Sequence, residues 1–329
     1  MSAPLVAEHA LSLWLGFGGV VAVLLLLDLA VLNRRAHVLT FREASLWSAG
    51  IVTTALLFGL YVLWRAGTQS ALEYYTGYLI ELSLSVDNLF VFILVFQFFA
   101  VPAEEQPRVL KWGIFGAMIM RAIFILAGAF MLERFHWIIY VFGAILIVTG
   151  LRMLKSHEER IEPEKNPLVK LARRLLPFTD TYRGHHFFVK ERRHGGGELR
   201  WLATPLFLVL LVVEWTDLVF AIDSIPAIFA VTRDPFLVYS SNIFAILGLR
   251  ALFFVLAGMM DKFIYLKPGV AFILVFVGIK MTLSGWFKIP TPVSLAVILT
   301  ALVTAVTLSL LKTRAEAEAS EAASGAGGA

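Results

Sequence analysis

Tyr78–Ala100 reads YLIELSLSVDNLFVFILVFQFFA, and Leu211–Val231 reads LVVEWTDLVFAIDSIPAIFAV. Each segment is apolar enough and long enough to cross a bilayer, which takes about 20 mostly apolar residues in a helix. Together they nevertheless carry five acids: Glu81, Asp87, Glu214, Asp217 and Asp223. Carboxylates are costly in hydrocarbon and normally face a protein interior or an aqueous path, where they bind or relay ions. These five acids are therefore the first candidates for a functional site.

The composition of the chain is that of an integral membrane protein. Of its 329 residues, 59% are hydrophobic and the mean hydropathy is +0.81, whereas a soluble domain is about half apolar. The sequence predicts an all-α polytopic protein with about nine transmembrane helices. Their expected positions are 11–33, 46–64, 74–100, 112–132, 137–154, 203–230, 237–259, 269–286 and 293–311.

The distribution of Lys and Arg predicts the orientation, because cytoplasmic loops are enriched in these residues. With the N-terminus outside, the outer segments hold only Arg65, Arg134, Arg233 and Lys288, and the other loop cations lie inside. The nine spans then leave the C-terminus in the cytoplasm.

Changes in composition divide the chain into six parts. We expect an N-terminal two-helix segment at 1–72, membrane repeat 1 at 73–154, a basic cytoplasmic loop at 155–200, membrane repeat 2 at 201–287, a final transmembrane helix at 288–314 and a disordered tail at 315–329. The loop is rich in Pro and Gly, which marks a linker, and its LVKLARRLL stretch has the pattern of an amphipathic surface helix.

The two membrane halves resemble each other. SVDNLFVF at 85–92 aligns with AIDSIPAI at 221–228, MRAIFILAGAFM at 120–131 with LRALFFVLAGMM at 249–260, and TGLRML at 149–154 with VGIKMT at 277–282. The alignment pairs Glu81 with Asp217, Asp87 with Asp223, Asn88 with Ser224 and Arg121 with Arg250. Each unit has three helices, an odd number, so the second must be inverted in the membrane. Inverted repeats are typical of secondary transporters with binding sites near the midplane.

Helix geometry limits how the acids can meet. Residues seven apart share a face, which places Glu81 over Asn88 and Asp217 over Ser224, whereas Asp87 and Asp223 lie about 100° away. Pro226 cannot donate to the Ile222 carbonyl, so an unwound turn could bring Asp223 to the same ion. We expect such a break in the second repeat and, by symmetry alone, in the first.

The candidate ligands all coordinate through oxygen. They are Glu81, Asp87, Asn88, Glu214, Asp217, Asp223 and Ser224, with Asp28 of the first span as a further acid. Oxygen ligands favour hard cations such as Mn²⁺, Mg²⁺ or Ca²⁺. The alternative is that Arg121, Arg250 and Lys280 neutralise the acids structurally, or fill the site when the metal is absent. Asn242 could line the path or only cap a helix.

Other functional classes have no support in the sequence. It contains no phosphate loop, catalytic triad or nucleotide fingerprint, so we expect no enzymatic activity, resident cofactor or nucleic-acid partner. The absence of cysteine excludes disulfides and thiolate metal ligands.

Three motifs carry a resemblance to a known family: ELSLSVDNLFVF at 81–92, the long segment VEWTDLVFAIDSIPAIF and its continuation to Phe254, and DLAVLNRRAH at 28–37. On these the chain resembles the TerC/Alx family of tellurium-resistance-associated membrane proteins over nearly all of residues 10–312. The resemblance implies a bacterial inner-membrane protein of the LysE-like transporter group, with the family's acidic motif at Glu81, Asp87, Asn88, Glu214, Asp217, Asp223 and Ser224. An acid-lined path would repel the tellurite oxyanion, so we interpret that label as indirect.

The sequence thus favours a secondary transporter that exports Mn²⁺ from the cytoplasm, with proton antiport as the simplest charge compensation. Its expected partners are the lipid bilayer, the divalent ion and protons; protein partners are not indicated. Export of another substrate such as Ca²⁺ is an alternative. The rival from another class is a membrane assembly or metal and tellurite stress component without transport activity.

Overall fold

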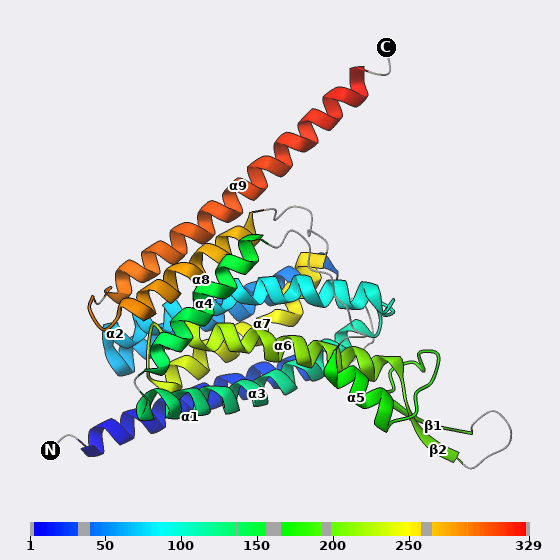
Figure 1. Ribbon diagram of the computed structural model, residues 1–329, viewed down its shortest axis with the longest axis horizontal. Coiled ribbons are helices and arrows are strands. Elements are labelled where there is room, and N and C mark those ends of the chain that lie inside the picture. Colours follow the sequence, from blue (N-terminus) through cyan, green and yellow to red (C-terminus); the bar gives the residue numbers. More distant parts are fainter. Residues whose placement is uncertain are drawn as a thin grey trace.

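The computed structural model describes residues 3–31, 40–135, 137–155, 166–192, 199–257, 265–287 and 289–326. The chain is almost entirely helical (Figure 1). Its elements are α1 (Ala3–Val31), α2 (Phe41–Phe98), α3 (Gln106–Arg134), α4 (Ile138–Lys155), α5 (Pro167–Leu175), β1 (Phe188–Arg192), β2 (Leu199–Ala203), α6 (Pro205–Phe229), α7 (Pro235–Ala257), α8 (Leu266–Leu283) and α9 (Thr291–Ala326). The prediction of an all-α polytopic membrane protein is confirmed.

In the described residues, eight helices are long and apolar enough to cross a membrane. One of them, α2, contains two of the predicted spans, because Gly67 interrupts it with φ 85° and ψ 177°. The Tyr74 hydroxyl donates to the carbonyl of Ala55 over 3.1 Å, although a straight helix would separate these residues by about 28 Å. The two arms of α2 therefore fold back on each other, and eight helices supply nine spans.

The helices differ in how much of their surface the protein covers. α7 lies at the centre, with 78% of its most apolar window buried, whereas α1 is 17% buried and the membrane part of α9 is 22% buried. The exposed side chains of the outer helices are large and apolar, as in Leu15, Leu26 and Val303. A lipid environment accepts such surfaces, and it also explains why the two outermost helices need few protein contacts.

Glycine allows α4 and α8 to approach closely. A Cβ atom on Gly278 would lie 2.8 Å from the carbonyl oxygen of Gly143, which is closer than such atoms can come. Small residues permit this kind of helix contact in membranes, where burial of apolar area gives little advantage over lipid. These helices contain the TGLRML and VGIKMT segments that align in the predicted repeat. The inverted relation of the two units stays a prediction.

The basic loop is more ordered than its composition predicts. The expected amphipathic helix is present as α5, but the sequence reading missed the antiparallel pair β1 and β2, which projects from one end of the bundle (Figure 1). The loop attaches to the turn between α2 and α3: the Tyr182 hydroxyl donates to the Phe99 carbonyl over 2.7 Å, and His185 Nδ1 lies 2.8 Å from Glu105 Oε2. Burial raises the pKa of Tyr182 to about 12, so its hydroxyl is a neutral donor at physiological pH.

Two expectations, an unwound turn in α6 and a disordered C-terminal tail, are wrong. First, α6 runs unbroken through Asp223 and Pro226 to Phe229. Pro226 lies in the last turn, where one hydrogen bond is lost without unwinding the turns that precede it. Second, the tail predicted to be disordered continues α9 as a helix to Ala326, beyond the bundle (Figure 1). Its Ala and Glu residues have high helix propensity, which the low hydrophobicity of the segment conceals.

Gly67 provides a test of the fold-back of α2. Its φ and ψ fall in a region that is essentially restricted to glycine, and another residue there costs on the order of 1–3 kcal/mol. We expect Gly67→Ala to lower the thermal unfolding temperature of the detergent-solubilised protein. The matched control is Gly50→Ala in the same helix, where a Cβ atom meets nothing within 4 Å and alanine favours the helix. Equal unfolding temperatures for the two variants would contradict the assigned turn.

Candidate metal site

A buried arginine gathers several of the candidate ligands. Arg121 of α3 has no solvent exposure, and its guanidinium forms ion pairs with Glu81 of α2 and with Asp217 of α6. The Nη2 atom is 3.0 Å from Asp217 Oδ1, and the Nη1 atom donates to Ser224 Oγ over 3.3 Å and to Asn242 Oδ1 over 3.2 Å. The Asn242 amide donates in turn to Glu81 Oε2 over 3.0 Å. We call these five residues the Arg121 cluster.

The cluster forms because four helices meet at it. Glu81 comes from the second arm of α2, Arg121 from α3, Asp217 and Ser224 from one face of α6, and Asn242 from α7. The predicted sharing of a face by Asp217 and Ser224 is confirmed by their common contact with Arg121. Two carboxylates face one guanidinium, so the ionised groups carry a formal charge of −1. The low dielectric of a protein interior strengthens the attraction of such a site for a cation.

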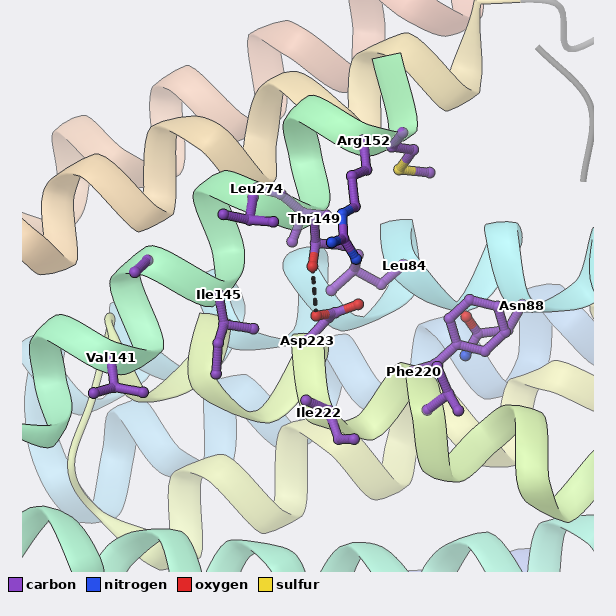
Figure 2. Close-up of a pocket in the computed structure, with 14 residues that line it drawn as sticks. Leu84, Asn88, Val141, Ile145, Thr149, Arg152, Phe220, Ile222, Asp223 and Leu274 are labelled. Carbon is purple, nitrogen blue, oxygen red and sulfur yellow. Dashed lines mark hydrogen bonds between the residues drawn. The ribbon is translucent and has the colours of Figure 1, made fainter. Parts of the chain in front are cut away.

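Asp223 lies elsewhere, in a second polar feature. The unbroken α6 directs it away from the Arg121 cluster and into a groove between α4 and α6, where it accepts a 2.8 Å hydrogen bond from the Thr149 hydroxyl (Figure 2). The groove has a volume of about 710 Å³ and is also lined by Asn88 and Arg152. In Figure 2 the Arg152 side chain extends toward Asp223. We call this the Asp223 groove.

Asn88 lines the Asp223 groove and belongs to the same helix as Glu81 of the Arg121 cluster. It is 1% exposed and lies two helical turns beyond Glu81 on α2. In the described part of the chain, neither its amide nitrogen nor its amide oxygen has a hydrogen-bond partner. Burying an unpaired amide costs roughly 1–3 kcal/mol. The walls of the groove are mostly apolar, and its polar lining residues are Asn88, Thr149, Arg152 and Asp223. The unpartnered Asn88 amide is therefore one of the few groups there that can bind a hydrated ion.

The remaining predicted residues whose side chains the structure describes form no hydrogen bond or ion pair with the Arg121 cluster, although Glu214 interacts electrostatically with Asp217. Asp28 of α1 pairs with Arg250 of α7 at 2.9 Å. Glu214, half-buried, packs its carboxyl over Gly116 of α3, and Lys280 of α8 interacts electrostatically with Glu73. Asp87 belongs to α2, but its side chain lies outside the described part of the structure. Residues that the sequence assigns to one site are thus distributed over the Arg121 cluster, the Asp223 groove and the Asp28–Arg250 ion pair.

Two lining residues, Thr149 and Arg152, were missed as site candidates. Both belong to the TGLRML segment that marks the repeat, so the alignment could have indicated them. Among the described residues, no three His, Cys, Asp or Glu side chains lie together in a way that could hold a metal. In this conformation the Arg121 guanidinium binds the oxygens that would otherwise be available to a cation.

This fold and its buried charges define a polytopic α-helical membrane protein. The chain belongs to the integral membrane protein TerC family, whose model matches residues 66–317. An uncharacterized membrane protein of Myxococcus xanthus is 52% identical over 302 residues, covering 92% of this chain and 93% of the relative. A protein of Escherichia coli named as a proposed membrane-bound redox modulator, Alx, is 48% identical over 295 residues, covering 87% and 90%. No solved structure matches. The expected family is confirmed.

The buried ion pairs make Arg121 the residue on which the stability of the cluster depends. Removing one partner of a buried pair leaves an uncompensated charge and costs about 3–5 kcal/mol. We expect Arg121→Gln to lower the unfolding temperature in detergent strongly, and Glu81→Gln added to it to recover part of the loss. Arg65→Gln, which removes a partly buried arginine bonded to Ser12, is the control with a small effect. An Arg121→Gln protein as stable as the wild type would contradict the assigned pairs.

Proposed function

We propose that the protein is a secondary transporter that exports a divalent metal ion, Mn²⁺ by preference, from the cytoplasm across the bacterial inner membrane. The observation that carries the proposal is the convergence of Glu81, Asp217, Ser224 and Asn242 on one buried cationic group. These residues offer carboxylate, hydroxyl and amide oxygens, the ligands that suit Mn²⁺, Mg²⁺ and Ca²⁺. The conformation with Arg121 in place is, in this proposal, the metal-free state.

Charge supports the exchange of Arg121 for a divalent ion. With Arg121 the two carboxylates face a single positive charge, which leaves a formal charge of −1, whereas a divalent ion balances both. A guanidinium also satisfies the buried oxygens between transport cycles, which avoids the large cost of unpaired carboxylates. Arg121 then occupies the place of the metal ion and must move aside when the ion binds. The Asp223 groove, with the unpartnered Asn88 amide in its wall, is a route by which the ion reaches the cluster.

Export requires charge compensation. Moving two positive charges outward against about 100 mV costs about 4.6 kcal/mol. Proton antiport is the simplest solution, because carboxylates that release the metal can take up protons at the same place. The proposed orientation has the N-terminus outside and the C-terminus, together with the α5 and β1–β2 loop, in the cytoplasm. It rests on the distribution of Lys and Arg in the short loops.

Two other functions are consistent with parts of the molecule. An exporter of Ca²⁺ would use the same oxygens. A membrane assembly or stress component would use Arg121 only to hold helices together, and the buried ion pairs suit that role equally well. The name of the Escherichia coli relative proposes redox modulation. Because this chain contains no cysteine, thiol chemistry of its own cannot provide such a function.

Metal flux separates these functions. We expect inside-out membrane vesicles containing the protein to accumulate Mn²⁺ when a proton gradient is imposed, and Glu81→Gln or Asp217→Asn to reduce the initial rate at least about tenfold. Glu191→Gln on β1, which pairs with the exposed Arg183, is the matched control and should transport normally. The flux is read by a Mn²⁺-quenched dye inside the vesicles. If the wild type moves no Mn²⁺, the transport proposal fails and the assembly function gains support.

Competition between Arg121 and the ion predicts a second effect. If Mn²⁺ binds the oxygens that Arg121 now holds, the metal should raise the unfolding temperature of Arg121→Gln more than that of the wild type, because the variant has no guanidinium to displace. Titration of both purified proteins with Mn²⁺, with Arg65→Gln as the control, measures the difference. An Arg121→Gln protein that Mn²⁺ does not stabilise would show that the cluster is not the binding site.

A further inference from the structure

A second buried arginine, Arg250 of α7, is only 6% exposed. Its Nη1 atom donates to Asp28 Oδ2 over 2.9 Å, while its Nε atom is buried and has no partner among the described residues. The side chain of Asp28 is 28% exposed, unlike the acids of the Arg121 cluster. This ion pair is therefore less enclosed than the cluster, and among the described side chains Arg250 pairs with one carboxylate.

Arg250 lines two small cavities. One, of about 10 Å³, is also lined by Asp217 of the Arg121 cluster and by apolar side chains that include Leu110 and Val213. The other, of about 30 Å³, is lined by Asp28, Lys111 and Trp47. Ile114 of α3 borders both. A cavity of 10–15 Å³ is roughly the space that one water molecule needs. Arg250 thus stands between the Arg121 cluster and Asp28.

We propose that Arg250 is the gate between the Arg121 cluster and the membrane face at which α1 ends, and that Asp28 holds this gate. The inference rests on the proposed function, in which that face is cytoplasmic. A fixed positive charge in a narrow passage with apolar walls repels cations, as arginines do in channels that exclude them. While Arg250 remains in place, a metal ion on that side cannot reach Asp217.

The Asp28–Arg250 ion pair also provides a way for the gate to open. A divalent ion that arrives from the face where α1 ends meets Asp28 first and competes with Arg250 for its carboxylate. Its double charge gives it the stronger attraction at equal distance. Arg250 is then released from Asp28 and can move out of the passage. The aromatic contacts of α1 with α2 and α7 are made by Trp14 and Phe17, and the window that ends at Asp28 is mostly exposed, so the last turns of α1 can shift with Asp28 at less cost in packing than the rest of the helix.

The absence of cysteine in the chain allows a direct test without metal. Ala117 lines the cavity beside Asp217 and is 3% exposed, so Ala117→Cys places one thiol behind the gate. In inside-out vesicles, a cationic and an anionic methanethiosulfonate reagent of equal size are compared by their labelling rates. With Arg250 present, we expect the cationic reagent to react more slowly. Arg250→Gln should raise the ratio of cationic to anionic rate about tenfold, whereas Arg65→Gln should not change it.

The charge-swapped variant Asp28→Arg with Arg250→Asp separates a gate from a structural ion pair. It keeps the pair but places a negative charge in the passage, so we expect the rate ratio to rise at least as far as in Arg250→Gln. If the swap returns the wild-type ratio, or if Arg250→Gln accelerates both reagents equally, Arg250 only holds helices together and the inference is overturned. Should Arg250→Gln fail to fold, the swapped protein carries the test alone.

The labelling test is independent of the transport test. A raised ratio together with no Mn²⁺ flux in the wild type would overturn the proposed function and leave the gate in place. An unchanged ratio together with normal Mn²⁺ flux would overturn the gate and leave the proposed function intact.

Discussion

The arrangement of the bundle depends on one buried charge, the guanidinium of Arg121. Within a membrane, lipid chains solvate apolar side chains as well as protein does, so apolar burial alone does not determine which helices meet. A fully buried arginine determines which helices meet, because its N–H groups must find hydrogen-bond acceptors on neighbouring helices. Arg121 finds them on α2 and α6 and on the central helix α7. Peripheral α1 and α9 are much less buried within the protein.

Much of the fold and part of the Arg121 cluster could be predicted from the sequence. The spans follow from hydrophobicity, and the meeting of Glu81 with Asp217 agrees with their alignment in the two repeats. What the sequence could not specify is which cation pairs with which acid. Arg121 and Arg250 are aligned, yet Arg121 binds two acids of the repeats while Arg250 binds Asp28, which lies outside them. Pairing depends on how helices dock, and periodicity along a single helix carries no information about that.

The failed expectation for Asp223 has a specific physical cause. The sequence predicts that Pro226 unwinds the helix near Asp223, but a proline in the last turn removes one hydrogen bond and leaves the earlier turns intact. The helix stays regular, so Asp223 is directed to Thr149 of α4 rather than to Arg121. The sequence contained both possibilities, since a straight helix points Asp223 about 100° away from Ser224. The balance between them depended on where the helix ends, and helix ends are the least predictable feature of a sequence.

In the proposed transporter, the separation of Asp223 from the Arg121 cluster would suit alternating access better than a single compact site. A transporter must never connect its site to both faces at once, and two approaches that reach the site from different helices can be closed separately. The Asp223 groove lies between α4 and α6, whereas the small cavity lined by Arg250 and Asp217, which we call the Arg250 passage, is bordered by α3 and α7. Asp217 belongs to the cluster and to the wall of the Arg250 passage. Any movement that frees Asp217 from Arg121 therefore also changes the field at Arg250, which gives the two arginines a direct physical means of coupling.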